Sequence, residues 1–109
     1  MKATYSIRQY QTQNGKIPFA DWMRSLRDAR AKAKIWQRIA RAENGNFGDH
    51  KITSDGVWEM RIDYGPGYRL YYAIYKNEIV ILFCGGDKRN QDADIRQAIN
   101  FKNDYEANQ

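Results

Sequence analysis

The chain has 109 residues, of which 28% are charged and 14% aromatic, and it carries a formal net charge of +5 at pH 7. This length and composition predict one folded domain spanning residues 1–109 and exclude a disordered chain. No run approaches the ~20 apolar residues that cross a bilayer, and a signal-peptide core is missing, so we expect a cytoplasmic protein with no membrane partner. A single cysteine and a single histidine exclude an internal disulfide and a cysteine- or histidine-rich metal site. We therefore expect neither a metal nor a cofactor.

The first half of the chain predicts a strand followed by two helices. Apolar and polar residues alternate over residues 4–10, which is typical of a strand at a sheet edge. Pro18 suits a first helical position, and the apolar residues at and after Phe19 recur at i, i+3, i+4 and i+7, which predicts a buried helical stripe. Asp28 is expected to cap a second helix that runs to about Glu43 and is closed by Asn44-Gly45.

Residues 56–88 predict three strands joined by tight turns at residues 65–67 and 76–77. Side chains alternate along a strand, so pairing the residues that flank each turn gathers one apolar face. The members of this face are Trp58, Met60, Ile62, Leu70, Tyr72, Ile74, Ile79, Ile81 and Phe83. The same pairing places Arg61 across from Tyr71, and Asp63 across from Arg69, on the opposite face.

A hinge at Gly85-Gly86 is expected to lead from the last strand into a final helix capped by Asn90. The order of strand, two helices, a run of strands and a last helix predicts the α+β class. We expect an antiparallel sheet with two N-terminal helices packed on it and a C-terminal helix.

Candidate chemistry is concentrated on the polar face of the predicted sheet, in Arg61, Arg69, Tyr71 and Lys88, with His50 and Lys51 nearby. Guanidinium groups match phosphate oxygens in a bidentate manner, and cations stabilise the charge that a phosphodiester gains in its transition state. RNA supplies its own nucleophile in the 2′-OH, and a tyrosine ring can stack on an unpaired base.

An alternative interpretation involves no chemistry: Arg61 pairs with Glu59 or Asp63, Arg69 pairs with Asp63, and Tyr71 only packs. The basic stripe on the second helix is also open to three interpretations, as a solvated face, as a phosphate-binding surface or as a dock for an acidic partner. Its members are Arg30, Lys34, Arg38 and Arg41.

Three motifs in this order, W-E-M-R-I, G-Y-R-L-Y-Y and G-G-D-K, together with I-P-F-A-D-W-M-R-S-L near the start, resemble the HigB-like branch of the RelE/ParE toxin superfamily. The resemblance implies a RelE-like fold and the toxin of a type II toxin–antitoxin pair, with a helix-turn-helix antitoxin as partner. Such toxins cleave mRNA, typically in the A site of the 30S ribosomal subunit, and so inhibit translation. They use 2′-OH attack without a metal and leave a 2′,3′-cyclic phosphate.

By motif, the resemblance implies that Arg61 and Arg69 hold the scissile phosphate and that Lys88 is the basic residue after the last strand. Tyr71 is added from the predicted register as a stacking group or an acid. The further RNA-binding candidates are Lys51, Arg89, Arg38 and Arg41. We expect alanine at Arg61 or Arg69 to abolish growth arrest while leaving the fold intact.

Two other functions stay open at this point. A ParE-like protein with the same fold would poison DNA gyrase without cutting RNA. A degenerate toxin would act only as a binding protein. The set of Arg61, Arg69 and Lys88 favours the nuclease, because a gyrase inhibitor needs no phosphate clamp.

Overall fold

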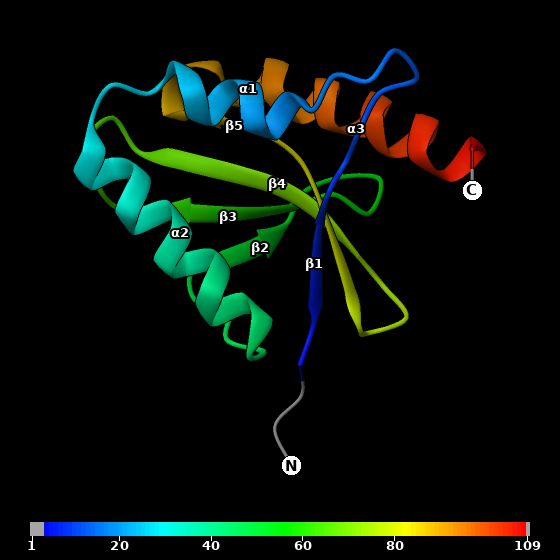
Figure 1. Ribbon diagram of the computed structural model, residues 1–109, viewed down its shortest axis with the longest axis horizontal. Helices are drawn as coiled ribbons and strands as arrows, with labels where there is room; N and C mark the ends of the chain where they lie inside the picture. Colours follow the sequence, from blue (N-terminus) through cyan, green and yellow to red (C-terminus); the bar gives the residue numbers. More distant parts are fainter. Residues whose placement is uncertain (1–3, 109) are drawn as a thin grey trace.

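The computed structural model describes residues 4–108, which form one five-stranded sheet and three α-helices (Figure 1). In chain order the elements are β1 (Ser6–Gln9), α1 (Pro18–Ser25), α2 (Ala29–Glu43), β2 (His50–Ile52), β3 (Trp58–Ile62), β4 (Tyr68–Tyr75), β5 (Ile79–Asp87), the short 3-10 helix η1 (Lys88–Asn90) and α3 (Gln91–Ala107). Within this described range no helix is both long enough and apolar enough to cross a membrane.

The sheet has the strand order β1-β5-β4-β3-β2, and β1 runs parallel to β5 whereas all other neighbours are antiparallel. The α+β class and the C-terminal helix are confirmed, but the expectation of a wholly antiparallel sheet is wrong. In the described part of the chain, β1 comes first, and the two helices that follow it lead to β2 at the opposite edge of the sheet. The antiparallel run from β2 to β5 then brings the chain back beside β1, in the same direction (Figure 1).

Helices cover both faces of the sheet. On one face, Phe19 of α1 and Ile35 of α2 pack in a core with Leu70 and other strand residues. On the other face, Ala98 of α3 packs in a second core with Phe83. The face that carries the candidate Arg61, Arg69 and Tyr71 is therefore largely buried under α3.

The β3–β4 pairing differs from the predicted register by two residues. Ile62 pairs with Tyr68, so five residues rather than three connect the strands. A shift by an even number keeps every side chain on its predicted face but changes its neighbour across the strand. Arg61 lies opposite Arg69, and Glu59 lies opposite Tyr71.

The β4–β5 pairing differs by one residue over the first part of β5, which moves those side chains to the other face, and a bulge between Tyr71 and Tyr72 makes the difference two residues beyond it. Tyr75 pairs with Ile79, so the turn has three residues instead of two, and Lys76 and Asn77 adopt φ values of 57° and 54°. Val80 and Leu82 therefore join the core under α1 and α2. The side chains predicted for that core, Ile81 and Phe83, lie under α3 instead.

The predicted Gly85-Gly86 hinge is also wrong, because both glycines lie inside β5. A Cβ atom on Gly85 would overlap the ring of Trp22 from α1, and one on Gly86 would overlap the carboxylate of Asp94 from α3. The two glycines let helices on opposite faces approach the same strand closely.

Candidate functional site

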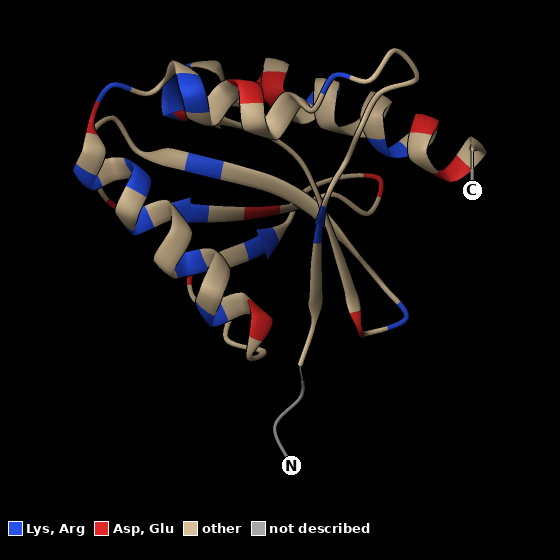
Figure 2. Cartoon of the chain, viewed as in Figure 1, with Lys and Arg blue, Asp and Glu red and all other residues tan. Residues whose placement is uncertain are grey.

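An open pocket of about 370 Å³ lies where β3, β4 and the end of β5 meet. It is lined by Asp49, Arg61, Ile62, Asp63, Gly67, Tyr68, Arg69 and Lys88. The structure thus brings together three of the four residues to which the sequence assigned catalysis. Figure 2 shows further Lys and Arg residues on α2 and one on strand β2.

Arg61 reaches this pocket from β3, and its partner is Asp49 rather than Glu59 or Asp63. Its Nη2 lies 2.9 Å, and its Nε 3.2 Å, from Oδ1 of Asp49. Both side chains are well exposed, and an ion pair of this kind is worth about 0–1 kcal/mol. Arg61 can therefore exchange the carboxylate for a phosphate at little cost in free energy.

Arg69, by contrast, is held by a buried ion pair with Glu59, not by Asp63 as predicted. Its Nη1 lies 3.2 Å from Oε1 of Glu59, and the Arg69 side chain is 11% exposed whereas that of Glu59 is fully buried. Tyr71 donates to Oε2 of Glu59 at 3.2 Å and Gln91 of α3 at 2.7 Å. These bonds from β4 and α3 fix Glu59, which in turn fixes the guanidinium of Arg69 at the pocket wall.

Tyr71 does not line the pocket. It is fully buried in the core under α3, and burial with the neighbouring Glu59 raises the pKa of its hydroxyl far above the ordinary value. In this position its ring cannot stack on an incoming base, and its hydroxyl serves to orient Glu59.

The aromatic side chain in the pocket is Tyr68, which sequence reasoning missed. Its ring packs edge to face on Trp22, with 6.0 Å between ring centroids. Tyr68 directly follows the β3–β4 turn, so the turn length was the signal that could have found it. Asp49 was missed as well, because the polar connector that holds it carries no pattern.

The other predicted cations have separate places. Lys88 is exposed on η1 and also lines an adjoining hollow with Arg89 and Arg96. Arg89 itself is paired with Asp87, with 2.8 Å between its Nη2 and Oδ2. Lys51 is exposed on the edge strand β2, outside the pocket lining.

Arg38, predicted to contact RNA, is engaged in hydrogen bonds to backbone carbonyls. Its Nη1 donates to the carbonyl of Arg61 at 2.6 Å, and its Nη2 donates to the carbonyl of Phe47 at 3.1 Å. It thereby holds the connector before Asp49 against β3. Arg41, farther along α2, is exposed.

His50 lies outside the pocket, in an aromatic stack between Phe47 and Trp58, with 5.2 and 4.7 Å between ring centroids. Its Nδ1 lies 2.7 Å from the hydroxyl of Tyr72, and burial, together with the charge of Arg38, lowers its pKa. No cluster of three histidine, cysteine or acidic side chains suited to a metal ion occurs among residues 4–108.

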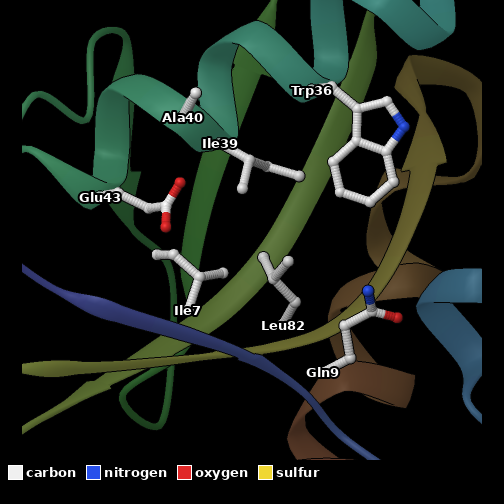
Figure 3. Close-up of a pocket in the computed structure, with 7 residues that line it drawn as sticks. All are labelled: Ile7, Gln9, Trp36, Ile39, Ala40, Glu43 and Leu82. Carbon is white, nitrogen blue, oxygen red and sulfur yellow. The ribbon is translucent and has the colours of Figure 1, made fainter.

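An apolar groove between α2 and β1 is the other conspicuous hollow near the basic helix (Figure 3). Trp36 and Ile39 of α2 face Ile7 of β1 across it, and Glu43 closes one end. The groove is lined by no cation and no nucleophile, so we assign no chemistry to it.

Comparison with known proteins places the chain in a family. Residues 21–101 match the family model described as "Phage derived protein Gp49-like (DUF891)". An uncharacterised protein from Haemophilus influenzae (strain ATCC 51907 / DSM 11121 / KW20 / Rd) is 52% identical over 82 residues, which cover 75% of this chain and 83% of the relative. The match to the family model extends over β2 to β5 and the whole pocket. The chain therefore belongs to the Gp49-like family of phage-derived proteins.

Proposed function

We propose that this protein is the toxin of a type II toxin–antitoxin module, with a RelE-like fold of the HigB type, and that it is an endoribonuclease acting on mRNA. The observation that carries the proposal is the meeting of Arg61, Arg69 and Lys88 in one open pocket. Membership of a phage-derived family and the resemblance of the motifs around these residues support it.

The reaction suited to this pocket is an internal transfer of the phosphodiester. The 2′-OH of one nucleotide attacks the adjacent phosphorus, the bond to the 5′ oxygen of the next nucleotide breaks, and a 2′,3′-cyclic phosphate and a free 5′-OH result. Arg61 leaves Asp49 to bind a non-bridging oxygen, and Arg69, held by Glu59, binds from the facing strand. Each contact contributes about 3–4 kcal/mol, by analogy with single oxyanion donors.

Two other groups in the pocket can handle the protons. The ammonium of Lys88 is exposed and can protonate the leaving 5′ oxygen. Asp63 is exposed and makes no ion pair within residues 4–108, so its carboxylate is free to accept the proton of the 2′-OH. If Asp63→Asn cleaves RNA at the wild-type rate, Asp63 is not the group that accepts the proton.

The partners of the proposed toxin are a helix-turn-helix antitoxin and mRNA bound in the A site of the 30S subunit in the cytoplasm. A net charge of +5 favours both the RNA and the ribosome electrostatically. The antitoxin acts by keeping the cationic pocket from its substrate.

Brief induction in cells, with mapping of mRNA 5′ ends, tests the proposal. Wild-type protein is expected to arrest growth and produce cuts phased with codons, whereas Arg61→Ala produces neither at the same level of folded protein. Arg8→Ala is the matched control, because Arg8 is an exposed arginine on β1 outside the pocket lining. DNA damage without cuts would support gyrase poisoning instead, and intact mRNA in unharmed cells would support a binding protein.

A further inference from the structure

A second pocket, of about 500 Å³, lies between α1, α3 and the β1–α1 connection, over the end of β5. Figure 1 shows α1 and part of α3 at the same end of the sheet, and both contribute residues to the lining. Its lining includes Asn14, Lys16, Trp22, Gly85, Gln97 and Phe101. None of these residues takes part in the cleavage site described above.

Two of the side chains that line this pocket are aromatic. Trp22 of α1 lies against β5 where Gly85 leaves room for its ring, and Phe101 of α3 contributes a second aromatic ring. Both side chains are only partly buried, so part of each ring is open to solvent. Aromatic surfaces of this kind stack on flat heteroaromatic rings.

The rim of the pocket is polar and has unused hydrogen-bonding groups. The amide of Gln97 and the ammonium of Lys16 are exposed and make no side-chain hydrogen bond or ion pair in the described part of the chain. Asn14 accepts from the hydroxyl of Thr12 through its oxygen, which leaves the amide N–H groups to donate. An apolar ligand would leave these groups without partners, whereas a base edge presents both donors and acceptors.

This pocket adjoins the cationic one. Trp22 lines the second pocket and contacts the ring of Tyr68, which lines the first. On the sheet, Gly85 in the second pocket directly precedes Gly86, the residue that pairs with Arg69 in the first. The two pockets are therefore joined through the contact of Trp22 with Tyr68 and through neighbouring residues of β5.

We propose that the pocket between Trp22 and Phe101 binds a nucleobase of the RNA, next to the phosphate that is cleaved. The identity of the substrate as RNA rests on the proposed function. Stacking on the indole provides affinity for any base, and the amides of Gln97 and Asn14 read the base edge. The thiol of Cys84 in this pocket takes no part, since it is buried and its pKa is raised to about 12.

Nucleotide titration of ¹⁵N-labelled Arg61→Ala protein tests the inference without cleavage. AMP, GMP, CMP and UMP are each added, with inorganic phosphate as a separate control, and the indole N–H of Trp22 is followed by NMR. At least one nucleotide is expected to shift this resonance and that of the Gln97 side chain, whereas phosphate is expected to shift neither. Gln97→Ala should weaken binding about 2- to 10-fold, which corresponds to one hydrogen bond.

Gln37→Ala is the matched control, because Gln37 is likewise an exposed glutamine on a helix, far from this lining. Shifts confined to the cationic pocket, equal effects of phosphate and nucleotides on Trp22, or equal losses in Gln97→Ala and Gln37→Ala would each overturn the inference. Failure of the proposed function is distinct: it would appear as a wild-type protein that cuts no RNA, whatever the titration shows. In an active enzyme, Gln97→Ala is expected to relax base preference beside the cut.

Discussion

The ion pair between Arg69 and Glu59 makes a sharp prediction about stability. Arg69→Ala removes the cation from a carboxylate that is fully buried, leaving it with only the bonds from Tyr71 and Gln91. Breaking one side of a buried pair costs about 3–5 kcal/mol, because the remaining charge stays desolvated. Since total stabilities are about 5–15 kcal/mol, this variant should be severely destabilised. The expectation that alanine at Arg69 leaves the fold intact is therefore withdrawn.

Urea denaturation of purified proteins measures this effect. Arg61→Ala is the internal comparison, because it breaks an exposed pair in the same pocket and should cost no more than about 1 kcal/mol. Adding Glu59→Gln to Arg69→Ala removes the stranded charge while keeping an acceptor for Tyr71 and Gln91, and it should recover much of the loss. Equal losses for Arg61→Ala and Arg69→Ala, or no recovery in the double variant, would refute the reasoning.

Three further predictions follow from contacts at other places. Asp49→Asn should tighten RNA binding up to about fivefold in filter-binding assays, because the carboxylate competes with phosphate for Arg61. Tyr10→Phe should cost about 0.5–1.5 kcal/mol near neutral pH by losing the bond to Asp104. Burial and Asp104 raise the pKa of Tyr10 from 10.0 to about 12, so this stabilisation is complete below pH 10.0 and is lost as the pH rises through about 12. Unfolding curves at several alkaline pH values check that the free energies of unfolding of Tyr10→Phe and wild type become equal. Gly85→Ala should lower the free energy of unfolding by about 1–3 kcal/mol and shift indole fluorescence, because the added methyl overlaps the tryptophan ring above it.

Local sequence signals were sufficient for α1 and α2, whereas Asn90, which was expected to cap the last helix, precedes α3 but makes no side-chain capping hydrogen bond. Pro18 begins α1, and the carboxylate of Asp28 accepts from the backbone N–H groups of Arg30 and Ala31 at the start of α2, as its position predicted. Capping and first-turn chemistry involve residues a few positions apart, so they can be read without knowing the tertiary structure.

Local sequence signals did not predict the register of the strands correctly. The turn at Lys76-Asn77 includes one residue more than its two-residue signature suggested, and one residue is enough to exchange the two faces of β5. The side chains of β3 and β4 lie on their predicted faces, because the predicted pairing of these strands was wrong by two residues, an even number. Both faces of β5 are apolar, so its composition could not reveal the error.

The candidate site was predictable only in its cations. Arg61 and Arg69 share a strand face whichever even register applies, so their proximity followed from alternation. The environment of their anionic partners was not predictable. Asp49 lies in an irregular connector, and Glu59 is hydrogen-bonded to Gln91 of α3, 32 residues farther along the chain. Long-range packing of this kind has no local sequence signature.

The parallel pairing of β1 with β5 has a consequence for biosynthesis. Ser6–Gln9 can pair only after the strand that begins at Ile79 has been synthesised. The carboxylate that holds Arg69 gains its hydrogen bond from α3 only when Gln91 is present. Pairings of such long sequence separation form late in folding. In a nascent chain that is still short of α3, the guanidinium of Arg69 therefore lacks the hydrogen-bonded support that Glu59 gains from Gln91. Under the proposed function, a ribosome completes most of each toxin molecule before that molecule can attack a message, including the one being read.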